Sequence, residues 1–451
     1  MKTINARTVR SVATLALLST APLAAGCASA SDEGGMLIGD RSPSHSARQN
    51  TYAKGEIPSA PAEDVRQVVQ GNTQFAIDLY RQINETVGPK ENIFFAPQSV
   101  STALAMTYAG AKGATGNEIA RALHFNLEGE KLHAAFGNLN ARLVTSQQEK
   151  DGVVVRNANG LFGERTLKPT SEFVTTLTRN YGADFAQLDF KNAAEASRMA
   201  INRWVSDATD HRISTLMPEG SITTISRVVI ANAMTFVGSW KDAFDATLTK
   251  PAQFHLADGS ETTVKVMHKR LQDGSYYEND LFQSVRIDCT TDAANPGGPA
   301  YQLVVALPRA GKLEQFEGAM SAGLFDQLGT VTSALPSHVN LSLPKFKINM
   351  PPRSLRTELI RLGVDRAFSE AANFSGISGE ELVTLSDVLH TATITVDEKG
   401  AVASAATGGG AVTTSYPSTV RELNVDRPFF VLIREANTGA IAFMGRVADV
   451  R

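Results

Sequence analysis

The sequence predicts a mixed α+β protein in one large domain, and two patterns support this. From about residue 63 onwards, helical and extended patterns alternate without a second long linker. The last segments of the chain read as buried strands, so the C-terminus must complete the core. The 451 residues, 43% hydrophobic and 20% charged, have the composition of an ordinary globular protein.

The helical patterns come first along the chain. Apolar residues recur at helical spacing from Val65 to Ile83, and Gly88-Pro89 ends this predicted helix. A second helix is expected over residues 100–109, with Ser99 as its N-cap. Thr115 and Glu118 have the spacing of a capping box for the next one.

Several later stretches predict strands. Residues 228–236 form a continuous apolar run, as in a strand buried on both faces. In residues 339–343 and 393–397, apolar and polar side chains alternate, which is the period of a strand. Residues 429–433 and 440–447 have the same apolar character at the end of the chain. A chain with core strands in its final residues is expected to fold as one unit.

The N-terminus is expected to be a targeting segment. Three basic residues precede an apolar run over residues 12–25, and Leu23-Ala24-Ala25-Gly26-Cys27 resembles a bacterial lipobox. This predicts a signal peptide over 1–26, lipidation of Cys27 and a flexible tether over 27–62. The expected location is the extracellular face of the cell envelope. Ordinary secretion after cleavage near Ala28 to Ala30 is the alternative.

Charge and cysteine content exclude several classes of function. The net charge of −3, with both signs interspersed, gives no case for a nucleic-acid partner. Cys27 and Cys289 are the two cysteines of the chain, and eight scattered histidines show no metal-ligand spacing. No metal, cofactor or disulfide framework is therefore expected.

Six collinear segments resemble the serpin family. The longest are NIFFAPQSVSTALAMTYAGAKGAT (92–115), LSLPKFKINMPPRSLRTELIRLGVDRAFSEAANFSGIS (341–378) and LSDVLHTATITVDEKG (385–400). The other three are one block with matches around Asn202 and in 232–240, and the segments 426–430 and 443–446. Because the segments run in order from about 70 to 450, the chain is identified as a member of this family.

The resemblance implies three β-sheets, eight or nine α-helices and an exposed reactive loop over about 398–420, in a serpin domain spanning 63–451. It also places Ser99, Asn232, Trp240 and His390 in the region that gates opening of the main sheet. For these four, packing or structural hydrogen bonding is the alternative role. Two residues depart from the family pattern. Ala96 stands where a serine is usual, and Ala401 stands where Thr or Ser is usual.

The composition of the loop fits a strand that waits to be inserted. No charged residue lies between Lys399 and Arg421. The positions expected to face the core after insertion (401, 403, 405, 407, 409 and 411) all carry small residues. Within the loop, Pro417 is the first proline. An inserted strand cannot bring unpaired charge into a core, whereas a simple linker has no such restriction. The predicted hinge comprises Glu398, Gly400, Ala401, Ala403, Ala405 and Thr407.

The family pattern places the reactive bond sixteen residues beyond Glu398, between Thr414 and Ser415. A shift within 412–418 stays open. The expected activity is irreversible inhibition of serine proteases of the elastase or subtilisin type, by a monomer that forms a covalent acyl complex. The small, uncharged side chain of Thr414 suits a shallow specificity pocket.

Two other functions are weighed against inhibition. Ser342-Leu343-Pro344-Lys345 spells the S-x-x-K motif of penicillin-binding enzymes, but there the serine opens a helix, and here it lies in an extended pattern. The second alternative is a non-inhibitory serpin-fold protein with a binding or chaperone-like role. The Gly408-Gly409-Gly410 run favours it, because glycine weakens a strand.

Overall fold

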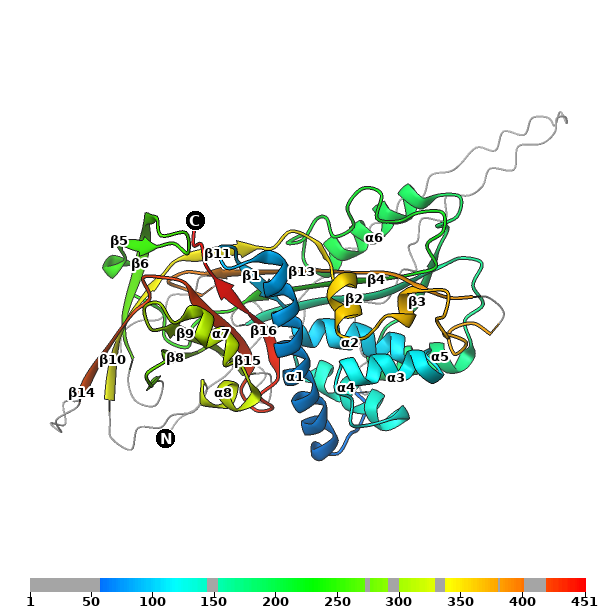
Figure 1. Cartoon of the computed structure of the whole chain (residues 1–451), viewed down its shortest axis with the longest axis horizontal. Helices are drawn as coiled ribbons and strands as arrows, with labels where there is room; N and C mark the ends of the chain where they lie inside the picture. Colours follow the sequence, from blue (N-terminus) through cyan, green and yellow to red (C-terminus); the bar gives the residue numbers. More distant parts are fainter. Residues whose placement is uncertain are drawn as a thin grey trace, which may run out of the picture. The chain divides into compact units, whose positions relative to one another are not determined.

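The computed structural model describes residues 57–143, 153–271, 276–290, 300–328, 337–379, 382–400 and 419–451. All of them belong to one compact unit, His45–Arg451. The described part contains three β-sheets and nine α-helices (Figure 1). The predicted α+β class, with three sheets and eight or nine helices, is therefore confirmed.

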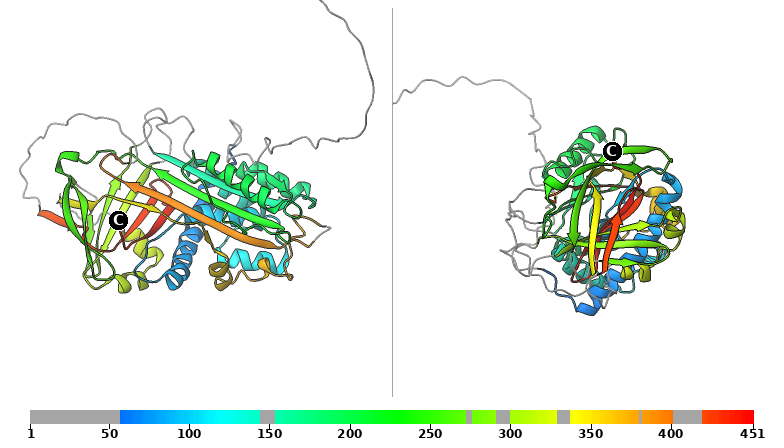
Figure 2. Two further views of the ribbon diagram at one scale, coloured as in Figure 1. Left: turned by 90° about the horizontal axis from the view of Figure 1, so that it is seen from above. Right: turned by 90° about the vertical axis from the view of Figure 1, so that its left-hand side faces the viewer.

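We call the first sheet the long sheet. It has the strand order β11-β13-β4-β2-β3, with β12 paired to β13. Its strands are β2 (Val154–Glu164), β3 (Phe185–Leu188), β4 (Val228–Val237), β11 (Phe346–Asn349), β12 (Arg353–Ser354) and β13 (Leu385–Val396). β2, β4 and β13 lie side by side along their length (Figure 2).

The other two sheets hold the remaining strands. The inner sheet has the order β1-β16-β15-β9-β8-β7, and the end sheet has the order β14-β10-β6-β5. The inner strands are β1 (Ile93–Phe95), β7 (Tyr276–Glu278), β8 (Phe282–Asp288), β9 (Tyr301–Pro308), β15 (Phe429–Glu435) and β16 (Ile441–Val447). The end-sheet strands are β5 (Lys250–His255), β6 (Glu261–Leu271), β10 (Ser337–Pro344) and β14 (Thr419–Asn424).

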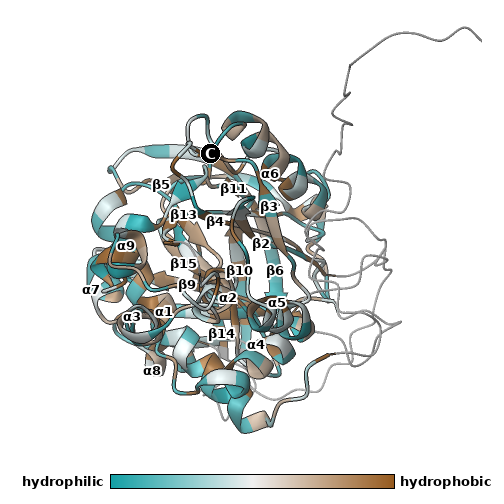
Figure 3. Cartoon of the chain, turned by 90° about the vertical axis from the view of Figure 1, so that its right-hand side faces the viewer, coloured by the Kyte–Doolittle hydropathy of each residue, from teal (hydrophilic) through white to brown (hydrophobic). Residues whose placement is uncertain are grey.

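The helices surround these sheets. They are α1 (Ala62–Val87), α2 (Pro97–Tyr108), α3 (Gly113–Ala122), α4 (Gly129–Leu143), α5 (Ser171–Thr176), α6 (Ala194–Ala208), α7 (Leu313–Gly318), α8 (Ala322–Gln327) and α9 (Arg356–Arg361). α1 ends at Gly88 as predicted, and the φ of 84° at this glycine explains the stop. Apolar residues concentrate in the central strands, and polar residues predominate on the outer faces of the surrounding helices (Figure 3).

Both predicted N-terminal caps are wrong. α2 begins at Pro97 after Ala96, so Ser99 lies inside the helix and does not cap it. α3 begins at Gly113, and Thr115 instead accepts a hydrogen bond from the Asn373 N–H. In both helices a residue that resembles a cap makes a long-range contact, because tertiary partners outcompete a local one.

The strand predicted to be buried on both faces, β4, separates two hydrophobic cores. Val228, Ile230 and Met234 face the main core, on the side of α2. Val229, Ala231 and Ala233 face a second, smaller core under α6. The pleat of a strand alternates its side chains, so a continuous apolar run serves both. Asn232 shares its face with Ile230 and Met234, and therefore points toward α2.

Candidate functional site

The predicted reactive loop lies outside the described residues, but both of its attachment points are described. The chain enters it from Gly400, shortly after β13, and leaves it at Thr419, where β14 begins in the end sheet. Ala401, Ala403, Ala405, Thr407, Thr414 and Ser415 thus fall outside the described residues, as does Cys27.

The long sheet has an uncommon feature next to this loop. β13 and β4 are neighbours and run parallel, with Leu385 opposite Val228 and Ile394 opposite Phe236. A strand placed between two parallel neighbours can run antiparallel to both. The loop continues from the C-terminal end of β13, so a chain that folds back there would have this direction. We call the line of pairing between β4 and β13 the seam.

The structure brings Ser99, Asn232 and His390 together beneath the seam. Asn232 and His390 are register partners across it, and the His390 Nδ1 lies 2.5 Å from the Asn232 Oδ1. The Asn232 Nδ2 donates to the Ser99 Oγ at 2.7 Å. All three residues are buried. We call them, together with Asn157 and Asn159 of β2, the seam cluster.

The hydrogen bonds of His390 define its protonation state. The backbone N–H of Ala96 donates to the Nε2 at 3.1 Å, so this nitrogen is an acceptor. The Nδ1 must then carry the proton and donate to Asn232. Burial lowers the pKa of His390 from 6.5 to about 3, which keeps the ring neutral. The backbone of Ala96 thus makes a polar contact here although its side chain cannot.

Sequence reasoning missed two members of the cluster. The Ser99 Oγ lies 2.7 Å from the Asn157 Oδ1 and 3.0 Å from the Asn159 Oδ1. Asn159 also accepts from the Asn232 Nδ2. The two asparagines, at i and i+2, share one face of β2, and this spacing was the available signal.

Trp240 and Glu398 meet at the end of the seam where the loop begins. The Trp240 Nε1 donates to the Asp397 carbonyl at 2.7 Å, and its backbone N–H donates to the Lys399 carbonyl. The Glu398 carboxylate accepts from the Lys345 Nζ at 2.5 Å and from the Thr249 Oγ1 at 2.9 Å. Partial burial opposes ionisation of Glu398, but these hydrogen bonds outweigh it and hold its pKa below the ordinary value.

Gly400 closes this end of the sheet. Its φ is 82°, and it bridges to Ser239. A Cβ at this position would overlap the Gly238 carbonyl oxygen. Only glycine therefore fits here in this conformation. The structure places Trp240, Glu398 and Gly400 at one end of the seam, and Ser99, Asn232 and His390 beneath its middle.

Other chemistry in the described residues is limited. Ser342 lies within β10, so the enzyme reading of its S-x-x-K motif lacks the helix start it needs. Burial raises the pKa of the Cys289 thiol to about 12, which keeps it unreactive. Among the residues described, no group of three or more His, Cys, Asp or Glu could hold a metal ion. The same residues include no helix long and apolar enough to cross a membrane.

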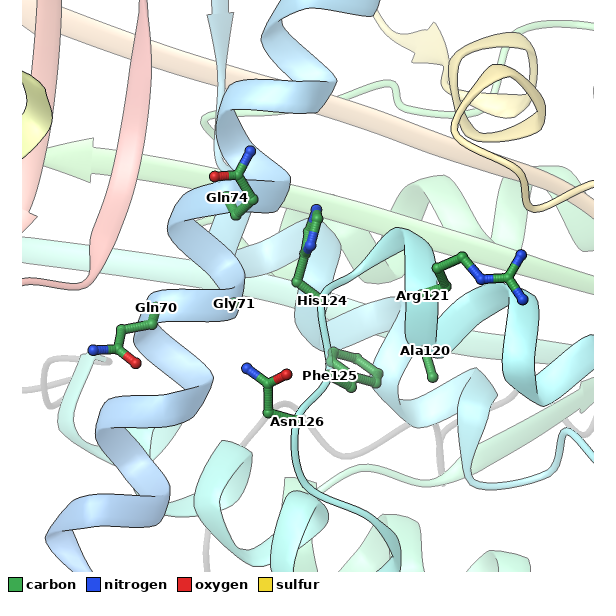
Figure 4. A pocket seen from close by; sticks show the side chains of 8 residues that line it. All are labelled: Gln70, Gly71, Gln74, Ala120, Arg121, His124, Phe125 and Asn126. Carbon is green, nitrogen blue, oxygen red and sulfur yellow. The ribbon is translucent and has the colours of Figure 1, made fainter. Parts of the chain in front are cut away.

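A surface hollow lies apart from the seam. It has a volume of about 420 Å³ and sits between α1 and the residues that join α3 to α4 (Figure 4). Gln70, Gln74, His124 and Asn126 are among its lining residues. The His124 Nε2 contacts the Asp78 carboxylate at 2.8 Å. None of the predicted site residues lines the hollow.

Known proteins with a similar sequence or fold point to the same family as the sequence motifs. Residues 70–450 match the family model described as Serpin (serine protease inhibitor). Leukocyte elastase inhibitor of Homo sapiens is 32% identical over 391 residues, which are 85% of this chain and 100% of that protein. Leukocyte elastase inhibitor A of Mus musculus is 33% identical over 393 residues, with the same coverage. The crystal structure of human thyroxine-binding globulin superposes with a TM-score of 0.74 at 27% identity, covering 86% of this chain and 99% of that one.

Proposed function

This chain belongs to the serpin family and is not an enzyme, and from that premise we propose that it irreversibly inhibits serine proteases by a suicide-substrate mechanism. The protease cleaves the reactive loop at Thr414-Ser415 and becomes acylated. The loop then enters the seam as a new strand and carries the protease with it. The relatives named as leukocyte elastase inhibitors support a target of the elastase type, and the small side chain of Thr414 suits an elastase- or subtilisin-like pocket.

The parallel pairing of β4 and β13 is the observation that carries this proposal. β13 has 12 residues and is followed, after four residues, by the uncharged segment that starts at Ala401. A hairpin through residues 397–400 would place residue 401 opposite 396, and Thr414 near residue 383 at the far end of β13. A strand of about 14 residues spans roughly 46 Å, so an attached protease would move across most of the sheet.

The energy of insertion is large enough to trap an enzyme. At roughly 1 kcal/mol net per backbone hydrogen bond, such a strand contributes on the order of 10 kcal/mol. This approaches the whole stability of an ordinary domain. A protease distorted by that force loses the geometry that deacylation requires, and the acyl-enzyme persists.

The proposal extends to location and assembly. Lipidation at Cys27 would anchor the domain to the extracellular face of the cell envelope, and a tether over 27–62 would let the loop reach a soluble protease. We infer a monomeric inhibitor, because a one-to-one acyl complex requires no second copy.

The decisive experiment mixes the purified domain with elastase-, subtilisin-, chymotrypsin- and trypsin-type proteases. We expect an SDS-stable adduct with the first two, and a released C-terminal fragment whose mass begins at Ser415. A fragment that begins elsewhere within 412–418 would shift the register of the bond. Cleavage without any adduct would instead favour the non-inhibitory alternative, for which the Gly408-Gly409-Gly410 run is the supporting observation.

A further inference from the structure

The face of the long sheet opposite α2 is covered by α6 and by the segment Thr209–Ile222 that follows it, which we call the return segment. Their apolar side chains pack on β2, β4 and β13 as the second core. Leu389 of β13 is the register partner of Ala231 of β4, and both belong to this core. The second core therefore crosses the seam. Because interiors are close-packed, a new strand at the seam requires this layer to move.

The return segment is bound firmly to α6 itself. The Asn202 Oδ1 accepts from the backbone N–H groups of Leu216 and Met217, at 2.9 and 2.7 Å. The Arg198 Nη1 donates to the Met217 carbonyl at 2.7 Å. These bonds lie within one body made of α6 and the return segment. They can remain intact while that body is displaced from the sheet.

This body is also tied to β2 at both ends. Before α6, the Glu164 carboxylate at the end of β2 accepts from the Lys191 N–H, and Arg165 pairs with Asp189. After α6, the Arg156 Nε on β2 contacts the Asp210 carboxylate at 2.6 Å. The first end has a short chain connection through β3, so it suits a hinge. The second end depends on side-chain contacts, so it can separate.

The backbone at the second end turns sharply where α6 ends. Asp210 and His211 have φ values of 50° and 58°, in the left-handed region. The Asp210 N–H donates to the Asp207 carbonyl and the His211 N–H to the Ser206 carbonyl, which is the usual closure of a helix C-terminus. This turn presents the Asp210 carboxylate to the Arg156 side chain, which is 9% exposed. The ion pair therefore opposes displacement of the body from the sheet at this end.

We propose that Arg156 and Asp210 form a latch that holds α6 over the seam until the loop inserts. The inference rests on the proposed function and deepens it. The latch sets how fast the sheet opens, and thereby the partition between trapping a protease and releasing it after cleavage. Arg156 and Asp210 are positioning residues, since neither touches the protease or the reactive bond.

Arg156→Met and Asp210→Asn test the latch directly. Methionine keeps much of the arginine stem, and asparagine tolerates the left-handed conformation, so both variants remove the ion pair without a large change of shape. Arg156 takes part in a further interaction, so Asp210→Asn is the more specific of the two. We expect loop insertion to become about fivefold faster in each, as for loss of one half-exposed ion pair. The double variant should match the single ones, because the two residues act as a unit. Arg156→Lys should restore most of the wild-type rate.

One further variant separates the latch from a general loss of surface charge. Arg165→Met removes the pair with Asp189 at the hinge end. That pair need not break, and this variant should insert at the wild-type rate. The measurements are the rate of adduct formation and the number of inhibitor molecules consumed per protease trapped.

Hydrogen exchange in the free protein makes the test independent of the protease. The amides of the return segment should exchange about fivefold faster in Asp210→Asn than in wild type. Wild-type rates of exchange and insertion in both charge variants would overturn the latch while leaving the proposed function intact. If the wild type forms no adduct with any protease class, the proposed function fails, and the exchange rates alone still decide whether the pair holds this segment.

Discussion

His390 joins two strands that must separate during the proposed insertion. Its ring contacts Asn232 across the seam and the backbone of Ala96 beneath it. Buried polar groups are costly unless they are satisfied, so these bonds favour the one register in which the seam is closed. Each of these hydrogen bonds can be replaced by one to the backbone of an inserting strand. The seam cluster therefore stabilises the closed sheet without making closure permanent.

The burial of His390 makes stability depend on pH. Its pKa is about 3 in the folded protein and about 6.5 when unfolded. Between these two pKa values the unfolded state binds more protons than the folded state. The free energy of unfolding is therefore highest above about pH 6.5 and declines as the pH falls toward 3. The decline is at most about 1.4 kcal/mol per pH unit. The urea concentration at the unfolding midpoint should decrease when the pH is lowered from 7.5 to 4.5. This decrease should be smaller in His390→Gln.

Burial acts in the same direction on His133, where it lowers the pKa to about 4, so a residual slope should remain in His390→Gln. An identical slope in wild type and His390→Gln would show that His390 does not control this transition.

Three of the predicted site residues come from local motifs. Ser99, Asn232 and His390 belong to three segments of the family pattern, and the structure places them in hydrogen-bonding contact. Their role in opening the sheet stays a prediction. Asn157 and Asn159 lie in a strand outside those segments, and their role emerges only when β2 is placed beside β4. The pairing depends on tertiary structure, which the sequence of one strand does not contain.

At the scale of elements, the two ends of the seam differ. One end is closed by Trp240, Gly400 and the Glu398 carboxylate with its partners Lys345 and Thr249. At the other end, Leu385 pairs with Val228 and the Ser386 Oγ accepts from the Arg227 N–H. An inserting strand would first displace the contacts of Gly400 and then proceed along the seam. Small residues in the hinge suit this, since each would be buried between β4 and β13.

Charge in the hinge should separate cleavage from trapping. Ala403→Arg or Ala405→Arg would bury an unpaired charge on insertion, at a cost of several kcal/mol. The protease should still cut Thr414-Ser415, but deacylation should outrun insertion and the variant should become a substrate. Ser404→Arg is the matched control, because position 404 would lie opposite the half-buried Thr393, whereas 403 and 405 would lie opposite the buried Ile394 and Ala392. Gel analysis should show adduct for Ser404→Arg and cleaved protein alone for the two alanine variants. Trapping of unchanged stoichiometry by Ala403→Arg would exclude strand insertion.

At the scale of the whole molecule, the sequence predicted which segments are strands better than it predicted their neighbours. The last strands were correctly predicted, and β16 pairs with β1 from the opposite end of the domain, with Ile93 opposite Arg446. The buried Arg446 contacts Glu317 at 2.7 Å, which ties α7 to the same region. Such pairings follow from the packing of all elements together, so no local pattern could predict them.

Anchoring also belongs to the whole molecule. Cys27→Ser should release the protein from membranes and abolish labelling by a fatty-acid probe, because the lipid would be attached through that sulfur. Cys289→Ser is the matched control: this thiol is buried, and the variant should remain membrane-bound and labelled. Fractionation and probe labelling of both variants measure this. Unchanged membrane association of Cys27→Ser would favour secretion or another mode of attachment.

Cleavage of the loop should stabilise the whole domain. Once the bond Thr414-Ser415 is broken, the hinge side of the loop can enter the seam without a protease attached. The new strand contributes on the order of 10 kcal/mol of hydrogen bonding. For a domain of this size, that predicts a rise in melting temperature on the order of 10 °C.

Calorimetry before and after limited cleavage measures this rise, with Ala403→Arg as the control. That variant should be cut at the same bond yet melt at its original temperature, because its charge keeps the strand outside the sheet. Equal gains in wild type and variant would mean that the stabilisation arises elsewhere than at the seam.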